Sequence, residues 1–291
     1  MATLGPLVTV VIPTRNRSAL VQQAIASVEA QTYPNWELVV VDDGSTDGSV
    51  DILRSRRHER LQVISLGDGD ANASWSSRVS RARNTGVAAG SGDLIAFLDS
   101  DDLWLARRLE LGVEALRSSG ARWCYGRMNL IDPSGVQIPL RAGNFDPKKG
   151  AIVEALLKDE TFAAVGSLLV ERTLFDEVGG FDESPRQHLR EDADLVLRLA
   201  TSADAAVVDE PVQLLREHPG RSTHSFGNPF QVSAAVFGKF LLSERDPHLR
   251  RLARARLVGV LAEGGRYYLR RGKLARAASL LTRALLADLR G

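Results

Sequence analysis

The sequence predicts an α/β protein with a mostly parallel central sheet. Residues 7–12 and 36–41 are almost entirely apolar, which is typical of strands that are covered on both faces. Between them, Leu20, Ile25 and Val28 recur at helical spacing and predict an amphipathic helix. A strand, a helix and a strand in this order indicate a crossover unit whose two strands run parallel.

The same alternation continues along the chain and becomes less regular in its second half. Apolar runs bounded by turn residues predict further strands at residues 61–65, 94–98, 123–128, 136–140 and 165–170. Apolar residues at helical spacing predict further helices at residues 47–53, 78–89, 104–116 and 152–157, and around Leu195 and Leu199. We therefore expect a sheet with helices on both faces.

The last part of the chain differs in composition from the rest. From Phe230 on it is rich in Ala, Leu and Arg, and residues 261–268 and 272–277 predict a helical hairpin similar to one tetratricopeptide unit. One such unit cannot bury its own apolar face, so we expect it to pack on the main domain, a partner or a membrane surface. We divide the chain into an α/β domain, residues 1–226, and an α-helical extension, residues 227–291.

Bulk composition limits the classes of function. The 291 residues carry a net charge of +1, which gives no general attraction to nucleic acid or to membranes. No apolar run approaches the ~20 residues that are needed to cross a bilayer. The single cysteine, Cys124, lies in an apolar and aromatic run and is expected to be a buried structural thiol. We expect a cytoplasmic protein, with attachment to the inner face of the membrane left open.

Three carboxylates follow the strand that is predicted at residues 94–98. Asp99 and Asp101 are separated by one residue, so an extended chain points both to the same side. Carboxylates repel one another unless a cation or hydrogen-bond donors lie between them, and such oxygen ligands suit Mg²⁺ or Mn²⁺ shared with substrate phosphates. The alternative is an acidic loop that caps the next helix, with Asp102 as the N-cap residue.

Polar residues also follow the first two strands, at 14–17 and 42–45. In parallel α/β sheets, ligands bind beyond the carboxyl ends of the strands. Both segments are equally suited to plain turns and helix caps. The helix at 78–89 is basic, and its three arginines, Arg78, Arg81 and Arg83, would contact a diphosphate, neutralise the carboxylates or form a solvated face.

Two later segments contain further candidate residues. Glu191 and Asp192 lie at the start of a predicted helix, where a carboxylate either stabilises the helix dipole or acts as a general base. Arg216 and His218 lie in a segment that is rich in Pro, Gly and Ser, which we expect to be a loop. His218 is either an ordinary surface histidine or part of the site.

Seven separated stretches together resemble the family 2 glycosyltransferases, nucleotide-sugar-dependent enzymes of the GT-A fold. In chain order they are VVIPTRNR (10–17), QTYPNWE (31–37), VVDDGSTD (40–47), ARNTG (82–86), FLDSDD (97–102), GGFD (179–182) and EDADL (191–195). Each stretch alone is weak, but their order and spacing agree with the family over residues 8–224. The resemblance implies a GT-A fold with a Rossmann-like nucleotide-binding half, and metal-dependent, inverting transfer of a sugar.

The resemblance also implies a binding site for the donor. Its nucleoside would lie against Pro13, Thr14, Arg17 and Asp43, with Asp43 at the base. The full set of expected substrate-binding residues is Pro13, Thr14, Arg15, Arg17, Asp43, Arg83, Asn84, Asp99, Ser100, Arg216 and His218. Many relatives have an aromatic residue where this chain has Arg15, so stacking would fall to the guanidinium and we do not infer uridine.

Asp99 and Asp101 match the Asp-x-Asp motif of the family. The resemblance implies that Asp101 holds a divalent metal, Mn²⁺ or Mg²⁺, which bridges the diphosphate, and that Asp99 and His218 are further ligands. Asp192 aligns with the general base of the family, and Glu191 lies beside it.

The resemblance further implies that Arg216 and His218 close over the diphosphate as a late Arg-x-His element. The expected partners are a nucleoside-diphosphate sugar and a glycan, lipid-linked or other hydroxyl acceptor, with no nucleic acid. Contact of the C-terminal helices with a membrane or a protein is left open. Synthesis of cell-envelope glycan or exopolysaccharide is the expected role.

Other functions fit the sequence less well. A non-catalytic nucleotide-sugar-binding module would not need the pair Glu191 and Asp192. A nucleotidyltransferase would usually have a glycine-rich loop with Lys or Arg near the amino terminus, which residues 13–18 do not supply. A dinucleotide-dependent dehydrogenase is poorly supported because no G-x-G-x-x-G pattern follows the first strand.

Overall fold

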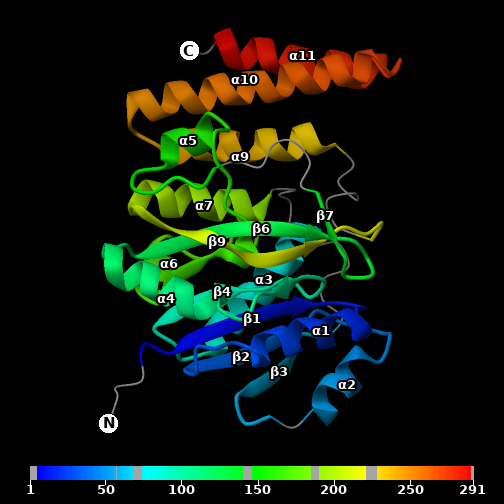
Figure 1. Ribbon diagram of the computed structural model, residues 1–291. Coiled ribbons are helices and arrows are strands. Elements are labelled where there is room, and N and C mark those ends of the chain that lie inside the picture. Colours follow the sequence, from blue (N-terminus) through cyan, green and yellow to red (C-terminus); the bar gives the residue numbers. More distant parts are fainter. Residues whose placement is uncertain are drawn as a thin grey trace.

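The computed structural model describes residues 5–56, 58–67, 74–139, 146–184, 190–220 and 228–289. Its strands are β1 (Val8–Thr14), β2 (Trp36–Asp42), β3 (Leu61–Ser65), β4 (Leu94–Phe97), β5 (Leu103–Trp104), β6 (Trp123–Ile131), β7 (Gln137–Ile138), β8 (Leu169–Glu171) and β9 (Ala205–Arg216). Its α-helices are α1 (Ser18–Glu29), α2 (Ser49–Ser55), α3 (Trp75–Ala89), α4 (Arg108–Ser119), α5 (Val153–Leu157), α6 (Arg172–Glu177), α7 (Glu191–Ser202), α9 (Pro229–Ser243), α10 (Pro247–Leu269) and α11 (Leu274–Leu289). Figure 1 shows these elements as a stack of layers around one sheet.

The first half of the chain forms the parallel part of this sheet. β1 pairs in parallel with β2 and β4, and β2 pairs in parallel with β3. All residues of β1 and β4 are buried, in agreement with the uninterrupted apolar runs in the sequence. The carboxyl ends of β1, β2 and β4 therefore open at one edge of the sheet, where the polar segments of the sequence follow them.

The second half completes the sheet in the order β3-β2-β1-β4-β8-β6-β9-β5, with β7 paired to β6. β8 runs antiparallel to both β4 and β6, and so joins the parallel part to the remaining strands. β6 and β9 run parallel, with shifts of register on either side of Arg127, which pairs with Pro211. The predicted α/β class with a helical extension is confirmed.

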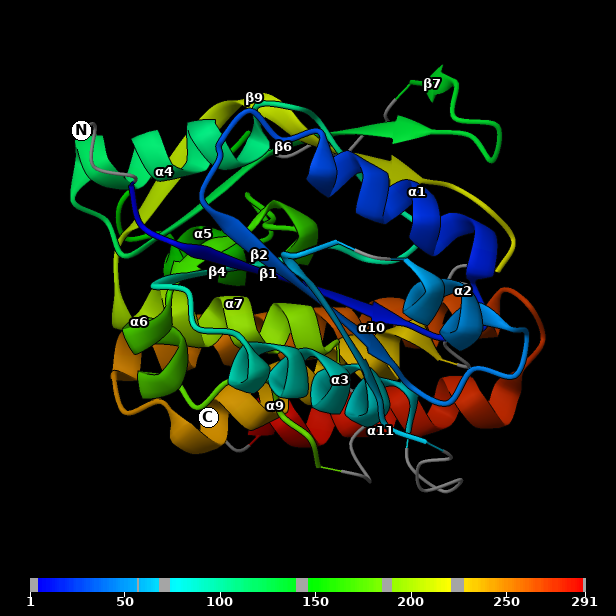
Figure 2. The same ribbon diagram turned by 90° about the horizontal axis from the view of Figure 1, so that it is seen from below.

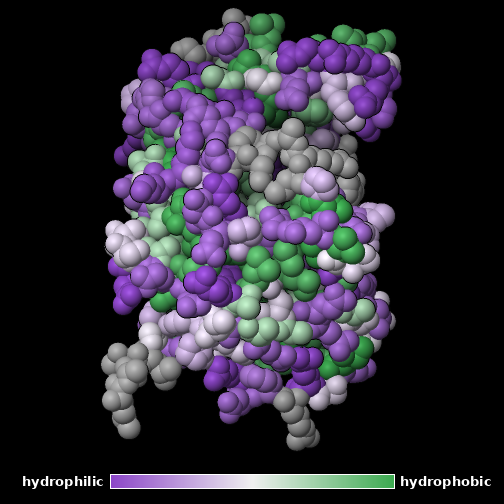
Figure 3. Space-filling view, in the orientation of Figure 1, coloured by the Kyte–Doolittle hydropathy of each residue, from purple (hydrophilic) through white to green (hydrophobic). Residues whose placement is uncertain are grey.

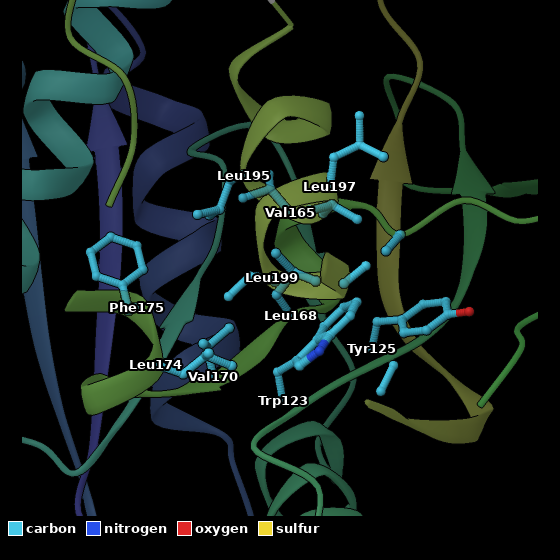
Figure 4. Packing of buried hydrophobic residues seen from close by; sticks show 14 of the residues in the cluster. Trp123, Tyr125, Val165, Leu168, Val170, Leu174, Phe175, Leu195, Leu197 and Leu199 are labelled. Carbon is cyan, nitrogen blue, oxygen red and sulfur yellow. The ribbon is translucent and has the colours of Figure 1, made fainter. Parts of the chain in front are cut away.

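Helices cover both faces of the sheet (Figures 1 and 2). Val21 of α1 and Leu109 of α4 belong to one core cluster, whereas Leu174 of α6 and Leu199 of α7 belong to a second cluster on the other face. Figure 4 shows this second cluster, in which the side chain of Trp123 lies among leucines and valines of the sheet, α6 and α7. The second cluster fixes α7, and with it the candidate base, against the sheet.

The helices α9, α10 and α11 are stacked beyond α7, on the side away from β1 to β3 (Figure 1). Phe240 of α9 belongs to the same core cluster as α7. The Nζ atom of Lys239 donates to Asp182 at 2.7 Å and to Asp194 at 2.9 Å. The extension therefore packs on the main domain, and α10 and α11 form the predicted hairpin with an apolar cluster of their own. The expected boundary between residues 226 and 227 lies outside the described residues.

Three predictions of secondary structure are wrong. Arg216, which was expected in a loop, is the last residue of strand β9; no strand was predicted there, because charged residues and Pro211 at the irregular centre of β9 hide the strand pattern. The strand predicted at 165–170 is a short 3-10 turn (Val165–Ser167) followed by β8. The helix predicted from Trp104 begins only at Arg108, since β5 precedes it. In the described parts of the chain, no helix is both long and apolar enough to cross a membrane.

Candidate active site

The carboxyl ends of β1, β2 and β4 meet at a cavity of about 290 Å³. Its walls are formed by the ends of these strands, by the carboxylate segment after β4 and by the start of α3. The lining residues are Pro13, Thr14, Arg15, Arg17, Asp43, Trp75, Arg78, Val79, Ala82, Asp99, Ser100, Asp101 and Asp102. The structure thus brings together the predicted residues of β1, β2 and the carboxylate segment. Arg83, Asn84, Arg216 and His218 are not among the lining residues.

Asp43 forms the wall at the end of β2. Its Oδ2 atom accepts a hydrogen bond from Arg78 Nε at 2.8 Å and lies 3.9 Å from Arg15 Nη1, and its Oδ1 accepts from Arg81 Nη2 at 3.4 Å. Burial raises the pKa of the Asp43 carboxyl, against the opposing effect of these arginines. Beside it, Thr14 Oγ1 is buried and has no hydrogen-bond partner among the described residues. A polar group of a bound ligand would satisfy this hydroxyl.

The carboxylate segment has the donor set of a divalent-metal site. Asp99, Asp101 and Asp102 each offer an oxygen atom, and these oxygens lie within 4.8 Å of one another. The Oδ2 atom of Asp101 lies 2.8 Å from Arg17 Nη1 and 3.0 Å from His218 Nε2. Clustered hard oxygens with an imidazole beside them fit Mg²⁺ or Mn²⁺, so the residues present agree with the expected metal.

Asp102 does not cap the following helix, contrary to the prediction. Its Oδ2 accepts from Gln213 Nε2 at 2.7 Å, and its Oδ1 accepts from the backbone N–H of Arg216 at 2.9 Å. The N-cap residue of α4 is Arg107, five residues further along. Both oxygens of Asp102 are thus held by β9, so this carboxylate fixes the segment to the second half of the sheet.

Arg83 links the carboxylate segment to the start of α7. Its side chain is buried, with Nη2 at 2.8 Å from Asp99 Oδ1 and Nη1 at 2.9 Å from Glu191 Oε1. Glu191 is itself buried, and this burial raises its pKa to about 7 although the Arg83 guanidinium acts in the opposite direction. One guanidinium thus joins Asp99 to Glu191, which are 92 positions apart in the sequence.

Asp192 lies in the first turn of α7, beside this link. Its side chain is 24% exposed, so the carboxylate is accessible from solvent, unlike that of Glu191. Its Oδ1 accepts from the N–H of Ala193 at 2.7 Å and lies 3.9 Å from Arg190 Nε. An accessible carboxylate in a fixed position is what a general base requires.

Asn84 and Arg216 were expected to contact the substrate, but their polar atoms form hydrogen bonds with other protein groups. Asn84 donates to the carbonyl of Phe181 at 2.9 Å and accepts from the N–H of the same residue at 3.0 Å. The guanidinium of Arg216 is buried and donates to the carbonyls of Asp101 and Pro133 and to the side chain of Gln23. In this structure both residues tie separate segments together at the edge of the site.

The sequence did not indicate Trp75, and Arg78 was expected only as one of three arginines that could contact a diphosphate, not as one of the substrate-binding residues. Both belong to the first turn of α3, line the cavity, and face the strand ends. Trp75 is 46% exposed, which is unusual for a tryptophan. The available signal was a lone aromatic residue at the end of a loop of small residues, next to a basic helix.

A second cavity, of about 230 Å³, lies between α7 and the C-terminal helices. Arg190 and Ala193, on either side of Asp192 and Glu191, belong to its wall. Most of its other lining residues are apolar, among them Phe162, Val196 and Phe237. The start of α7 thus borders the apolar cavity through Arg190 and Ala193, and is joined to Asp99 in the wall of the first cavity through Glu191 and Arg83.

Comparison with known proteins adds a family and a fold. A family model described as "Glycosyl transferase family 2" matches residues 9–179. The chain is 31% identical over 175 residues to the "UDP-Glc:alpha-D-GlcNAc-diphosphoundecaprenol beta-1,3-glucosyltransferase WfgD" of Escherichia coli, which covers 58% of this chain and 62% of the relative. It is 32% identical over 140 residues to the "Putative teichuronic acid biosynthesis glycosyltransferase TuaG" of Bacillus subtilis, covering 47% of this chain and 53% of the relative. The chain thus spans little more than half of the length of these relatives.

Two solved structures resemble the whole described fold. Staphylococcus aureus TarS 1-349 in complex with UDP-GlcNAc matches with a TM-score of 0.66 and 16% identity, over 95% of this chain and 90% of that one. The mannosyltransferase PcManGT of Pyrobaculum calidifontis, in complex with GDP-Man and Mn²⁺, matches with a TM-score of 0.64 and 21% identity, over 98% and 76%. At these identities the matches describe the fold alone.

Proposed function

Because the chain belongs to glycosyl transferase family 2 and has the GT-A fold, we propose that it transfers a sugar from a nucleoside-diphosphate sugar to a hydroxyl acceptor, with inversion at the anomeric carbon. One observation carries the proposal. An ionic link runs from Asp99, in the wall of the cavity at the strand ends, through Arg83 to Glu191, the residue before Asp192. This link supports a donor site and a base that act together.

The donor would occupy the cavity of about 290 Å³. Its nucleoside would lie against Pro13, Thr14 and Asp43, and its diphosphate near Arg17 and Ser100. Trp75 offers a ring for stacking on the base, a role that Arg15 can share through its planar guanidinium. Solved neighbours bound to UDP-GlcNAc and to GDP-Man support a nucleotide sugar without fixing its base.

Asp99, Asp101 and His218 would hold a divalent cation at the diphosphate. When bound, Mn²⁺ or Mg²⁺ would neutralise the negative charge that grows on the leaving nucleoside diphosphate. Arg17 lies 2.8 Å from Asp101 and adds positive charge at the same place. The Mn²⁺ in the PcManGT structure supports this assignment.

Asp192 would act as the general base. The acceptor hydroxyl oxygen attacks the anomeric carbon, its proton passes to Asp192, and the bond from that carbon to the diphosphate breaks with its electron pair on the leaving group. Attack from the face opposite the leaving group inverts the configuration. Glu191, bonded to buried Arg83, would position Asp192 and would not itself meet the acceptor.

We assign positioning roles to Arg83, Asn84 and Arg216, because their polar atoms are bonded to protein groups. This assignment revises the substrate contacts that the resemblance implies. A non-catalytic nucleotide-sugar-binding module is the alternative function, but it would need neither an accessible base nor a link that fixes it.

The acceptor would approach from the side of the second cavity, whose wall includes Arg190 and Ala193. Its apolar lining suits the apolar part of a lipid-linked acceptor. The names of WfgD and TuaG, a diphosphoundecaprenol glucosyltransferase and a teichuronic acid enzyme, support a role in cell-envelope glycan synthesis. We retain residues 1–226 as the transferase domain and residues 227–291 as its extension, which contacts a membrane or a protein.

Replacement of the base tests the function. We expect Asp192→Asn to lower the transfer rate at least about a hundredfold, because the side-chain amide of asparagine cannot accept the proton of the acceptor hydroxyl. Binding of the donor, measured as the thermal shift in a screen of nucleotide sugars with and without Mn²⁺, should be unchanged. Asp176→Asn, an exposed acid on α6, is the control. Equal turnover of Asp192→Asn and the wild type would contradict the assignment of Asp192 as the base. If the wild type bound none of the nucleotide sugars in the screen, the transferase proposal would be refuted.

A further inference from the structure

The outer face of α11 is apolar and uncovered. The helix packs on α10 through Ala277, Leu280 and Ala284, which are at most 6% exposed. Four leucines of the same helix are exposed, namely Leu274 (65%), Leu281 (38%), Leu285 (59%) and Leu286 (48%). The helical period places Leu274, Leu281 and Leu285 in one row beside the packed side. In Figure 3, some hydrophobic residues appear at the upper edge of the molecule, where α11 lies, beside hydrophilic ones. Exposed leucines that share one row of a helix mark a site of contact, because single surface leucines are normal but groups of them are not.

Exposed cations lie in and beside the turn between α10 and α11. They are Arg266 near the end of α10, Arg270, Arg271 and Lys273 in the turn, and Arg276 in α11. None of them forms an ion pair with a carboxylate in the part of the chain that the structure describes. Leu269, 52% exposed, lies among them, and the guanidinium of Arg271 lies 3.8 Å above the ring of Tyr267. We call these cations and the four leucines of α11 the hairpin face.

Charge is distributed very unevenly along the chain. Residues 247–291 contain eleven Lys and Arg but only two acids, Glu263 and Asp288, which gives this segment a formal charge of +9. The whole chain carries +1, so residues 1–246 carry −8. The positive segment lies at one end of the molecule, and β1 to β3 lie at the other (Figure 1).

We propose that the hairpin face docks on the surface of an anionic lipid bilayer, with α11 lying in the plane of the interface. Exposed leucines beside unpaired arginines and lysine match the acyl chains and the anionic headgroups of such a surface. A second copy of the chain is a poorer occupant, because it would bring two segments of +9 together. The charge of −8 on the rest of the molecule keeps that part away from the same surface.

Docking in this orientation would explain how a lipid-linked acceptor reaches the proposed active site, although the docking itself does not depend on the proposed function. The second cavity lies between α7 and the helices α9 and α10, on the side of the main domain that bears the hairpin. A lipid-linked acceptor would therefore meet the base from the side of the bilayer. Binding to lipid is measured without donor or acceptor, so its failure and a failure of sugar transfer are separate results.

Vesicle binding of the full chain tests the proposal. We expect the protein to sediment with vesicles of phosphatidylcholine and phosphatidylglycerol, and to bind pure phosphatidylcholine vesicles at least about tenfold more weakly. Raising the salt to 1 M should release it, because the Debye length falls to about 3 Å. The triple variant Arg270→Gln, Arg271→Gln, Lys273→Gln should lower partitioning on the order of a hundredfold, since each cation near the surface contributes about fivefold.

The apolar half of the face is tested separately. Leu274→Ser with Leu285→Ser should lower partitioning at least about tenfold while leaving the melting temperature near that of the wild type, because both side chains are exposed. Leu242→Ser is the matched control, since Leu242 is 89% exposed on α9, outside the hairpin face. Unchanged binding in the leucine variant, or no preference of the wild type for anionic vesicles, would overturn the proposal. So would a dimer in sedimentation velocity that the same leucine variant dissociates.

Discussion

Arg83 permits a test of how the candidate base is held. Replacing it by Met keeps an unbranched apolar stem and removes the guanidinium and its charge, so Asp99 and Glu191 lose bonds of 2.8 and 2.9 Å. Glu191 has a side chain that is only 6% exposed, so its carboxylate would be left buried without a partner. Removing one partner of a buried ion pair costs about 3–5 kcal/mol. Asp99 is one-third exposed, so water can replace its lost hydrogen bond. We therefore expect the free energy of unfolding at pH 8 to fall by about 3 kcal/mol, the lower end of this range.

The effect should depend on pH in a defined direction. The pKa of Glu191 is about 7 in the folded protein against 4.5 ordinarily, so the folded state binds the extra proton and wild-type stability falls as pH rises from about 4.5 to 7. Arg83→Met removes the group that lowers this pKa, so it rises further and the decline extends to higher pH. The destabilisation should therefore be larger at pH 8 than at pH 6.

Urea unfolding followed by tryptophan fluorescence at both pH values measures this difference. Steady-state kinetics should show kcat reduced by about a hundredfold with a smaller change in the donor KM, because the base is displaced and the nucleoside contacts remain. Arg83→Lys is the control, since it keeps the charge but cannot bridge both carboxylates. A loss below about 1 kcal/mol at pH 8, or equal losses at pH 6 and pH 8, would refute the reasoning.

Two further predictions concern the donor cavity and the extension. Trp75→Ala should raise the donor KM about tenfold with kcat nearly unchanged, because stacking of a base on an aromatic ring contributes about 1–3 kcal/mol. Trp75→Phe should restore most of the affinity, and an unchanged KM in Trp75→Ala would show that the ring does not touch the donor. Lys239→Met should destabilise the protein by about 1–2 kcal/mol at pH 7, because Lys239 holds Asp182 and Asp194. The pKa of Asp182 is lowered to about 2 by Lys239 and Ser184, against the effect of burial, so its contribution is present above its ordinary pKa of 3.8 and lost as pH falls towards 2. The gap between variant and wild type in thermal unfolding should narrow below about pH 4; a constant gap would contradict the assignment, and Lys158→Met, at an exposed ion pair, is the control.

The nucleotide-binding half could be predicted from the sequence because its physics is local. Strands buried on both faces have apolar runs that no polar alternation obscures, and in β1 every residue is buried. The order of such strands also places their polar ends at one edge, which is why Asp43 and Asp101 line one cavity, as the order of the strands predicts.

The other half of the site could not be read in this way. β9 contains Pro211 and irregular pairing with β6, so its pattern resembles a loop. The partners of Asp102 lie 111 and 114 positions away, and helix capping is the simplest local interpretation of an aspartate before a helix. The link through Arg83 is equally remote, since a motif shows which residue types are present but not which of them bond to each other.

The clamp of β9 on Asp102 has a consequence for the order in which the protein is made. A ribosome adds about 5–20 residues per second, so the carboxylate segment leaves it several seconds before Gln213 and Arg216 exist. Until then Asp102, 2% exposed in the finished fold, cannot be buried without losing its hydrogen bonds. The nucleotide-binding half thus remains incomplete as a nascent chain, and the carboxylate segment reaches its final position only once β9 has been synthesised. Truncation before residue 213 removes this clamp even though every residue of the cavity wall is retained.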